Sequence, residues 1–382
     1  MTDAAEHAIA AEHVFDGLAV HKDAAVIVRG RRIAALVPRA GLPRTMARRV
    51  LPEGAWLAPG FVDLQVNGGG DVLFNDDPSL DALAAIAAAH RRFGTTALLP
   101  TLITDRPEKT KTAIEAVNAA IDRVPGIVGL HLEGPFLSPE KPGVHDVRWI
   151  RRPEAADLAA LEALRKGKML VTLAPEVTPP GFIAQLVAAG RHVALGHSMA
   201  TYAQTRAAMA EGLRGFTHLF NAMRPLASRE PGPIAAALES PAAWYGLIVD
   251  GAHVDPAMLR LALRGAGLPV LVTDAMPPVG GARAEFTLYG ETVAAREGRC
   301  VRSDGRLAGS ALDMASAVRN CVRLLGVALA DALRFASLNA ATAIGLADDI
   351  GRLAAGRRAD MIALDPQDVR ILAVWTAGQE CR

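Results

Sequence analysis

Residues 61–103 read FVDLQVNGGGDVLFNDDPSLDALAAIAAAHRRFGTTALLPTLI, and this stretch contains the unit that repeats through the middle of the chain. An apolar, strand-like run over Phe61–Gly68 is followed by an alanine-rich helical stretch over Pro78–Phe93 and by a second apolar run over Thr95–Ile103. Short apolar runs that alternate with helical stretches are typical of βα units around a parallel sheet. The stretch therefore predicts a parallel α/β architecture.

The same alternation continues along the chain, where Pro153–Lys166 is another helical stretch. Eight strand candidates follow one another: Phe61–Gly68, Thr95–Ile103, Ile127–Gly134, Met169–Glu176, His192–Ser198, Gly215–Asn221, Tyr245–Gly251 and Val270–Ala275. Eight βα units predict a (β/α)₈ TIM barrel, which typically takes about 250 residues. An open doubly wound sheet is the alternative. It usually has fewer strands, however, and Gly68-Gly69-Gly70 lacks the GxGxxG spacing of a dinucleotide-binding turn.

The two ends of the chain contain short strands and no long helical pattern. The candidates are His13–Phe15, Ala24–Val28, Ile33–Val37, Ala359–Leu364 and Val369–Val374. A turn at Arg29-Gly30-Arg31 joins two of them into a hairpin. We therefore expect both ends to form one small β-sandwich domain from residues 1–58 and 349–382. This domain flanks a metal-dependent catalytic barrel of residues 59–348.

The overall composition narrows the classes of partner. The 382 residues include 41 basic and 40 acidic side chains, so the net charge of +1 gives no electrostatic reason to expect nucleic acid or an anionic membrane. We expect no membrane span, because no run of about 20 apolar residues occurs. Met1–Ala11 lacks the basic-then-apolar order of a signal peptide. Cys300, Cys321 and Cys381 are far apart, which favours free thiols and a cytoplasmic location.

Polar residues in the predicted strands gather at the carboxyl ends. These ends read Asp63–Asn67, His131–Glu133, Gly196–Ser198, Thr217–Asn221, Asp250–His253 and Thr273–Asp274. In a barrel the carboxyl ends of the strands converge on the face that carries catalytic groups. A lone strand histidine is more often a core residue, and a lone aspartate more often caps the next helix. Glu133, His197, His218 and Asp274 occur together on four strands, however, and this favours a catalytic site.

The residue types of this group indicate metal chemistry. Two imidazoles and a carboxylate suit a divalent transition metal such as zinc, with one position left open for water. The sequence therefore predicts a metal site formed by Glu133, His197 and His218. Such a metal lowers the pKa of water and polarises a carbonyl group. Asp274 is then placed to accept a water proton and to return it to a leaving group.

The segments around these residues resemble a known family. They are Pro59–Gly68, His131–Phe136, Gly196–Ser198, Thr217–Met223, Asp250–Asp255, Val272–Ala275, Leu307–Ser310 and Gly351–Asp360. The chain is similar over nearly its whole length to the amidohydrolase superfamily, and within it to the N-acetylglucosamine-6-phosphate deacetylase group. HLEGPF at residues 131–136 and THLFNAM at residues 217–223 are specific to that group.

The resemblance implies a reaction, the hydrolysis of the acetamide of N-acetyl-D-glucosamine 6-phosphate to D-glucosamine 6-phosphate and acetate. It implies that Glu133, His197 and His218 bind the metal. Asp274 then activates the water and protonates the departing amine. His145 polarises the carbonyl or holds the sugar. Without the family match, His145 is more simply interpreted as an exposed loop histidine.

The resemblance also implies a set of substrate contacts. They are Val144, His145, Asn221, Ala222, Arg229, Asp250, His253, Leu307, Ala308 and Gly309. Arg229 and His253 are expected to face the phosphate, where charge-assisted hydrogen bonds are strong. Residues 307–309 are expected in a loop after the eighth strand. Part of the phosphate site comes from a neighbouring subunit in this family, so the resemblance implies a homodimer.

One departure from the superfamily pattern concerns the number of metals. Many amidohydrolases carry His-x-His at the end of strand one, which supplies ligands for a second metal. Here those positions are Gln65 and Asn67, and neutral amides are poor ligands for a transition metal compared with imidazole. Strand four ends Ala174-Pro175-Glu176, so we expect no carbamylated lysine there. We therefore predict one tightly held divalent ion per subunit, zinc or iron(II).

Other functions remain open at this point. A deacetylase for another N-acetyl-hexosamine phosphate, such as N-acetylgalactosamine 6-phosphate, needs the same four catalytic residues. A cyclic-amide hydrolase or a deaminase is disfavoured by Arg229 and by the motif at residues 217–223. A non-catalytic scaffold with the same barrel typically loses its metal ligands, and here the ligands and the general base are all present.

Overall fold

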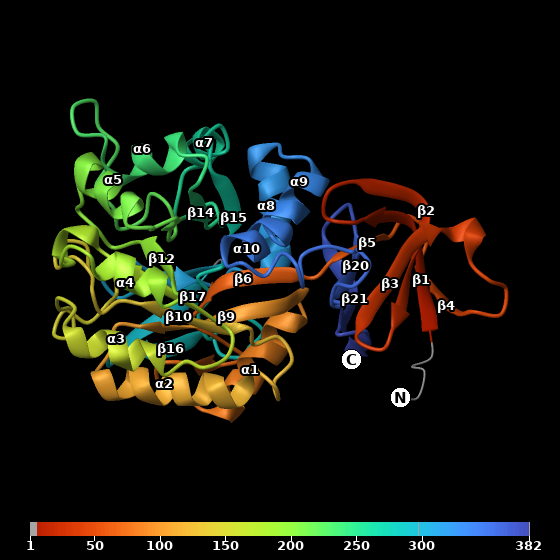
Figure 1. Cartoon of the computed structure of the whole chain (residues 1–382), viewed down its shortest axis with the longest axis horizontal. Coiled ribbons are helices and arrows are strands. Elements are labelled where there is room, and N and C mark those ends of the chain that lie inside the picture. Colours follow the sequence, from red (N-terminus) through yellow and green to blue (C-terminus); the bar gives the residue numbers. More distant parts are fainter. Residues whose placement is uncertain (1–5, 297, 382) are drawn as a thin grey trace.

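The structure, a computed structural model, describes residues 6–296 and 298–381. Residues 1–5, 297 and 382 lie outside the described residues. The first part of Met1–Ala11 and the outer ends of the expected segments 1–58 and 349–382 therefore lie outside them as well. A large α/β body and a smaller β body lie side by side (Figure 1).

Eight short parallel strands form the centre of the large body. Hydrogen bonds join them in the order β15-β14-β13-β12-β11-β10-β9-β6. Their bounds are β6 (Phe61–Val66), β9 (Thr95–Ile103), β10 (Gly129–Glu133), β11 (Lys168–Leu173), β12 (His192–Leu195), β13 (Gly215–Phe216), β14 (Trp244–Leu247) and β15 (Leu268–Leu271). A parallel bridge between Val66 and Ala275 brings the first and last strands together. The predicted (β/α)₈ barrel is confirmed, and every strand candidate overlaps an observed strand.

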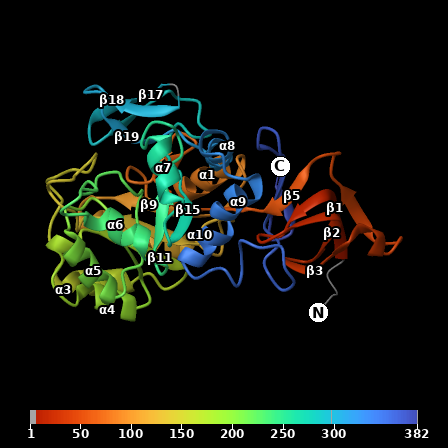
Figure 2. The same cartoon turned by 90° about the horizontal axis from the view of Figure 1, so that it is seen from above.

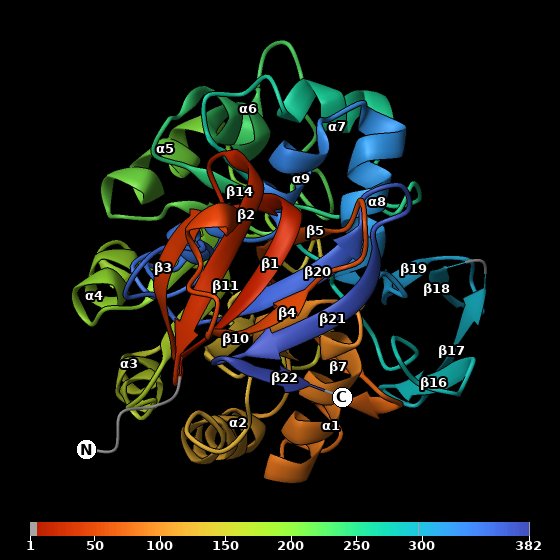
Figure 3. The same cartoon turned by 90° about the vertical axis from the view of Figure 1, so that its right-hand side faces the viewer.

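Helices surround these strands (Figures 1 and 3). They are α1 (Leu80–Arg91), α2 (Pro107–Ala120), α3 (Ala155–Glu162), α4 (Phe182–Ala188), α5 (Tyr202–Ala210), α6 (Gly232–Glu239), α7 (Pro256–Ala262), α8 (Met314–Leu325), α9 (Leu329–Phe335) and α10 (Leu338–Ala343), with 3₁₀ turns at Arg39–Gly41 and Pro175–Val177. Ser79 begins α1, since its hydroxyl accepts the backbone N–H of Ala82. Leu83, Ile86 and His90 then face the barrel at helical spacing.

Both ends of the chain meet in the smaller body. Its strands are β1 (Glu6–Phe15), β2 (Val20–Arg29), β3 (Arg32–Pro38), β4 (Ala47–Val50), β5 (Trp56–Pro59), β20 (Met361–Asp365), β21 (Arg370–Thr376) and β22 (Gln379–Cys381). Hydrogen bonds run in the order β22-β21-β20-β5-β1-β2-β3, and β4 also pairs with β1. The expected sandwich is thus one continuous sheet around a shared core that includes Ile9, Val26, Leu57, Met361 and Trp375. Figure 3 shows the early and late strands lying next to each other.

A four-stranded antiparallel sheet after the eighth barrel strand was not predicted. It consists of β16 (Glu285–Leu288), β17 (Glu291–Arg296), β18 (Arg299–Arg302) and β19 (Leu307–Ser310), and it lies beside the barrel (Figure 2). A two-stranded ribbon, β7 (Gly68–Gly69) and β8 (Val72–Leu73), was missed as well. Residues 307–309 therefore belong to a strand and not to the expected loop. The strands are short and carry exposed charges, so their alternation is weak in the sequence.

Below the strand ends, the interior of the barrel contains a buried polar layer. The ring of His131 contacts the hydroxyl of Thr101 through Nδ1 at 3.1 Å and that of Thr172 through Nε2 at 2.8 Å. Thr172 in turn contacts Thr217 at 2.6 Å. Burial lowers the pKa of His131 to about 4, so its imidazole is neutral at physiological pH. The layer runs from β9 through β10 and β11 to Thr217, and it thus lies below Glu133 and His218.

Replacing Asp63 in this interior with asparagine is expected to flatten the pH dependence of stability. Burial raises the pKa of Asp63 from 3.8 to about 7, although the Thr273 hydroxyl donates to its Oδ2 at 2.6 Å. Between these pH values the folded state holds a proton that the unfolded state has lost. Wild-type stability therefore falls as the pH rises from about 4 to about 7. Relative to wild type, Asp63→Asn should gain up to about 1.4 kcal/mol per pH unit over this range.

Melting temperatures of both proteins at pH 5 and pH 8 check this expectation. Asp77→Asn makes the same chemical change at an exposed site and serves as the control. It should leave the wild-type pH dependence unaltered. A constant difference between Asp63→Asn and wild type at the two pH values would mean that the Asp63 carboxylate is already ionised in the fold.

Candidate active site

The turns that follow three barrel strands hold predicted catalytic side chains in an uncommon backbone conformation. His197, His218 and Asp274 have positive φ angles of 47°, 33° and 52°. Residues other than glycine seldom adopt this region, which costs on the order of 1–3 kcal/mol each and is found at functional sites. Strand β13 accordingly ends at Phe216 and does not continue to Asn221 as expected, since His218 has already left the extended conformation.

The three predicted metal ligands converge at the carboxyl end of the barrel. Nε2 of His218 lies 2.9 Å and Nε2 of His197 lies 3.3 Å from Oε1 of Glu133, and the two Nε2 atoms are 3.1 Å apart. All three side chains are buried. Within residues 6–296 and 298–381, no other group of three such residues brings its ligand atoms this close together.

Hydrogen bonds around the cluster fit a bound cation. The carbonyl oxygen of Lys141 accepts from Nδ1 of His197 at 2.8 Å, which leaves the Nε2 lone pair directed at the cluster. Nδ1 of His218 is buried and has no hydrogen-bond partner among the described residues. A positive charge between two imidazole nitrogens and a buried carboxylate stabilises such a cluster, and a metal ion supplies that charge. The donor set is the one that zinc and similar divalent transition ions prefer.

Asp274 lies beside this cluster and is held by two amides. Nε2 of Gln65 donates to its Oδ1 at 3.1 Å, and Nδ2 of Asn67 donates to the same oxygen at 2.6 Å. Among the described residues, Oδ2 receives no such bond. Burial, followed by the charge of Glu133, raises the pKa of Asp274 to about 6. A carboxyl group with a pKa near neutrality is suited to exchange protons at physiological pH.

The charges of Glu133 and its neighbours depend on one another. Burial alone would raise the pKa of Glu133, but contacts with the His197 and His218 imidazoles, in the form that donates from Nε2, hold this pKa well below the ordinary value. Gln65 also donates to Oε1 of Glu133 at 3.1 Å, so one amide connects the metal cluster to Asp274. Glu133 is thus the anionic member of the cluster at neutral pH.

His145 is buried within this site and not exposed on a loop. Its Nδ1 accepts the backbone N–H of Thr104 at 3.2 Å and lies 2.9 Å from the hydroxyl of the same residue. Because Nδ1 is the acceptor, the ring proton resides on Nε2, which lies 3.8 Å from Oε2 of Glu133. Burial lowers the pKa of His145 well below its ordinary value. His145 therefore presents a neutral N–H donor next to the Glu133–His197–His218 cluster.

A cavity of about 190 Å³ opens onto these groups. Besides the metal ligands, His145 and Asp274, its lining consists of Asn67, Ile103, Gly143, Val144, Asn221, Ala222, Ile248, His253, Met276, Leu307 and Gly309. Six of these were predicted as substrate contacts from segments far apart in the chain: Val144, Asn221, Ala222, His253, Leu307 and Gly309. Nδ1 of His253 lies 2.6 Å from Oδ2 of Asp250. Asp250 therefore orients the His253 ring, which lines the cavity, and does not line the cavity itself.

Comparison with known proteins places the chain in a family. Residues 56–381 match the Amidohydrolase family. The protein belongs to this family. An N-acetylgalactosamine-6-phosphate deacetylase of Shewanella sp. (strain ANA-3) is 45% identical over 327 residues, which cover 85% of this chain and 82% of that protein. An N-acetylglucosamine-6-phosphate deacetylase of Haemophilus influenzae is 36% identical and covers 91% of this chain and 92% of its own length.

Solved structures resemble this amidohydrolase over almost the whole chain. The N-acetylglucosamine-6-phosphate deacetylase of Pasteurella multocida has a TM-score of 0.94 at 34% identity, covering 98% of this chain and 99% of that one. An Asp-to-Ala variant of the Mycobacterium smegmatis enzyme, in complex with N-acetyl-D-glucosamine-6-phosphate, has a TM-score of 0.90 at 35% identity, with the same coverage. The barrel and the sheet of the chain ends are thus both shared with these proteins.

Three predicted substrate contacts of this amidohydrolase, Asp250, Arg229 and Ala308, do not line the cavity. Arg229 is exposed in the segment between β13 and α6. Ala308 is fully buried, with Met276 and Val293, in the core beneath the small sheet. Within one chain, therefore, neither the Arg229 nor the Ala308 side chain belongs to the cavity lining.

Several site residues escaped the sequence analysis. Thr104 follows β9 directly, so the rule that polar residues gather at strand ends could have found it. The carbonyl oxygen of Lys141 acts through the backbone, and no side-chain pattern reveals it. Ile103, Ile248 and Met276 form apolar walls of the cavity and look like ordinary core residues in the sequence.

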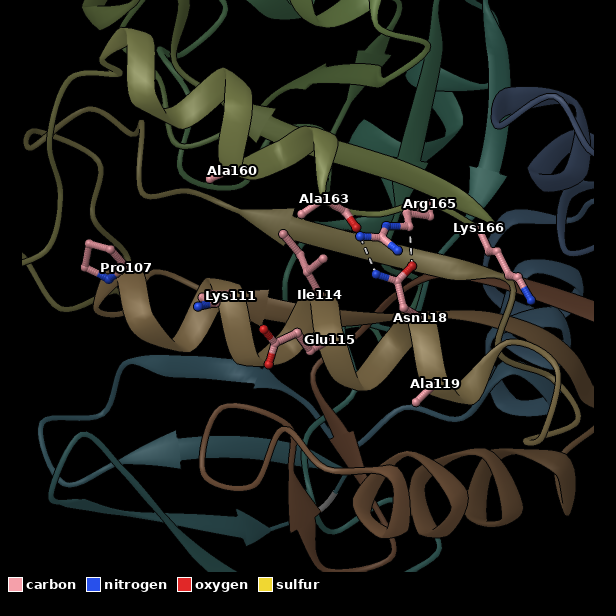
Figure 4. A pocket seen from close by; sticks show the side chains of 10 residues that line it. All are labelled: Pro107, Lys111, Ile114, Glu115, Asn118, Ala119, Ala160, Ala163, Arg165 and Lys166. Atoms are coloured by element: carbon pink, nitrogen blue, oxygen red, sulfur yellow. Dashed lines mark hydrogen bonds between the residues drawn. The ribbon is translucent and has the colours of Figure 1, made fainter.

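A larger hollow of about 730 Å³ lies between α2 and α3 (Figure 4). Asn118 bridges its rim, since its Nδ2 donates to the carbonyl of Ala163 at 2.9 Å and its Oδ1 accepts from the backbone of Arg165 at 2.9 Å. Lys166 pairs with Asp122 on the surface. These polar contacts hold the end of α3 against α2. Glu133, His197, His218 and Asp274 do not line the hollow, so it is separate from the candidate active site.

Proposed function

We propose that this amidohydrolase removes the acetyl group of N-acetyl-D-glucosamine 6-phosphate to give D-glucosamine 6-phosphate and acetate. The observation that carries the proposal is the buried Glu133–His197–His218 cluster with Asp274 held beside it. The names of the relatives at 34–45% identity support the substrate class. A non-catalytic scaffold has no need to keep ligands and base together in this way.

The side chains divide the reaction between them. A divalent ion held by Glu133, His197 and His218 supplies Lewis acidity, which acidifies water and polarises a carbonyl group. Oδ2 of Asp274 takes a proton from the attacking water and returns it to the nitrogen that leaves. The Nε2–H of His145 donates to the carbonyl oxygen as negative charge develops there. Apolar walls such as Ile248 and Met276 keep bulk water away from these groups.

The phosphate end of the site involves a second group of residues. His253, oriented by Asp250, lines the cavity and faces the sugar phosphate in this proposal. Arg229 reaches the phosphate from the neighbouring subunit of a homodimer, since it is exposed and lies outside the cavity of its own chain. The proposal keeps residues 59–348 as the catalytic domain, flanked by residues 1–58 and 349–382.

The remaining attributes also stay proposals. The ion is zinc or iron(II), one per subunit, and the location is cytoplasmic. None of the described helices is both long enough and apolar enough to span a membrane. Cys300 and Cys321 are buried free thiols, and Cys381 is a partly buried one.

A second candidate substrate is N-acetyl-D-galactosamine 6-phosphate. The observation in its favour is the 45% identity to the N-acetylgalactosamine-6-phosphate deacetylase of Shewanella sp.. The two sugars differ only at the C4 hydroxyl, so the metal ligands, Asp274 and His145 serve both equally. The preference for one epimer therefore depends on the residues that contact the C4 hydroxyl.

Acetate release from four compounds tests the proposal and the alternative together. The metal-loaded protein is assayed with both 6-phosphorylated epimers and with both unphosphorylated sugars. We expect a preference of about 10²-fold or more in kcat/KM for the phosphorylated form, because lost charge-assisted hydrogen bonds cost about 1.5–3 kcal/mol each. A higher kcat/KM for the galactosamine epimer would favour the second candidate. Absence of acetate release from all four compounds would disprove the proposed function.

A further inference from the structure

Asn67 is a rigid part of the cavity wall that the proposed mechanism has not used. Its side chain is fully buried and lines the cavity. Its backbone N–H donates to the carbonyl of Ala275 at 2.9 Å, and its own carbonyl accepts from the N–H of Phe74 at 2.9 Å. The turn after the eighth strand therefore fixes the N–H of Asn67, and the residue that follows β8 fixes its carbonyl.

The orientation of the Asn67 amide follows from its neighbour. Nδ2 donates to Oδ1 of Asp274 at 2.6 Å. The reversed amide would place its oxygen against a carboxylate oxygen, so the donor must face Asp274. Oδ1 of Asn67 is then buried and has no hydrogen-bond partner among the described residues. A buried acceptor without a donor is costly, and such a group at a functional site calls for an external partner.

We propose that Asn67 is a catalytic residue whose Oδ1 accepts the N–H of the scissile acetamide and then an N–H of the amine formed from it. This inference rests on the proposed deacetylase function and names a further group that recognises the substrate. Asp274 must reach the same nitrogen to protonate it, and Asn67 is hydrogen-bonded to Asp274. The acceptor is thus next to the place where the amide N–H has to be.

The other polar groups of the cavity are less suited to this task. The Nε2 atoms of His197 and His218 face the metal position. His145 presents a donor there, since its Nδ1 is occupied by Thr104. The acetamide of the substrate has a carbonyl oxygen, which His145 and the ion contact in the proposed mechanism. Its N–H is a donor for which these groups provide no acceptor. Oδ1 of Asn67 supplies the missing acceptor.

The step balances in atoms and protons. Water adds to the acetamide carbon, and one of its protons passes to Oδ2 of Asp274. That proton then moves to the nitrogen as the C–N bond breaks, so the amine carries its original N–H and the transferred proton. The acetyl carbon leaves as acetic acid, which ionises to acetate. By holding the original N–H, Asn67 directs the nitrogen lone pair towards Asp274.

Two stable ligands report on this contact without turnover. D-glucosamine 6-phosphate carries the nitrogen, whereas 2-deoxy-D-glucose 6-phosphate lacks it. Calorimetric titration of the metal-loaded protein gives both Kd values. In Asn67→Leu we expect Kd for the amine to rise about 10- to 100-fold, because a buried hydrogen bond to a polar nitrogen is lost. Kd for the deoxy sugar should stay within about threefold. In the assay, kcat/KM for the N-acetyl sugar phosphate should fall about 10²-fold.

Two further variants separate this role from support of Asp274. Gln65→Leu also removes one donor to Oδ1 of Asp274, but Gln65 does not line the cavity. It should lower kcat and leave the ratio of the two Kd values unchanged. Asn67→Asp keeps the shape and an acceptor oxygen, so it should retain the preference for the amine. If the leucine variant does not fold, the ratio of the two Kd values in Asn67→Asp tests the role of Asn67 instead.

The outcomes are distinct from one another. Equal weakening of both ligands in Asn67→Leu, or loss of the amine preference in Asn67→Asp, would overturn the role of Asn67. Those results leave the deacetylase function standing, since wild-type acetate release is measured separately. A wild-type protein that releases no acetate and binds neither sugar phosphate would overturn the proposed function itself, and the inference with it.

Discussion

Asp274→Asn is expected to lower kcat by about 10²- to 10⁴-fold while the fold and the bound metal remain, because proton transfer contributes this much in general acid–base catalysis. Gln65 and Asn67 both donate to Oδ1 of Asp274. In the variant they select the rotamer that keeps an oxygen there, which puts the amide –NH₂ at the position of Oδ2. That group cannot accept a proton from water. The measurement is kcat for acetate release, with metal content and melting temperature determined on the same preparation.

Asp77→Asn is the matched control, since it makes the same Asp-to-Asn change at an exposed site away from the cavity. It should retain the wild-type kcat. If Asp274→Asn deacetylated at the wild-type rate with its metal in place, another group would have to move the protons, and the assignment of Asp274 would be wrong. Loss of metal in the variant would instead mean that Asp274 helps to hold the ion.

Glu133→Gln is expected to abolish tight metal binding and to reduce kcat/KM by about 10³-fold or more, since Lewis acidity is worth several kcal/mol of transition-state stabilisation. Glu133 is the anionic member of the cluster, and both imidazoles contact its Oε1 at 2.9 and 3.3 Å. Its replacement by a neutral amide removes the charge that balances the ion. Elemental analysis of the purified protein should give one ion per wild-type chain and much less than one in the variant.

Chelation and re-addition of metal provide the matching test on the wild type. Activity should disappear with the ion and return when zinc or iron(II) is restored. Glu162→Gln changes an exposed glutamate of α3 and should keep one ion and full activity. Two tightly held ions per wild-type chain would contradict the prediction of a single metal, because Gln65 and Asn67 would then have to serve as ligands despite their hydrogen bonds to Asp274.

The barrel was predictable because its signal is repeated eight times in the sequence. Each unit combines a short apolar run with a helical stretch. An error in the bounds of one strand does not change the number of units. The four-stranded sheet of residues 285–310 was not predictable in the same way. Its strands are four to six residues long, carry exposed glutamate and arginine, and take their stability from contacts with distant residues such as Leu73, Ile103 and Met276.

The convergence of the proposed catalytic residues was predictable because strand ends of a barrel meet on one face whatever the details of the loops. That rule brought Glu133, His197, His218 and Asp274 together before any coordinates were known. The strand-end rule says nothing about residues in loops such as Arg229. Arg229 was expected from the resemblance alone, and it lies outside the cavity of its own chain. The sixth strand shows another limit, since the left-handed turn at His218 ends β13 earlier than an apolar pattern suggests.

By itself, the sequence determined the barrel, the pairing of the two chain ends and the identity of the four central residues, since hydrophobic periodicity and residue chemistry are local properties. Only the tertiary structure decided the proton positions and partners within the site. It showed that Thr104 turns His145 into an Nε2–H donor and that Lys141 directs His197 towards the cluster. It also showed that Asn67 keeps an unpaired acceptor beside Asp274. These properties depend on hydrogen bonds between residues far apart in the chain, whose geometry exists only once the barrel has closed.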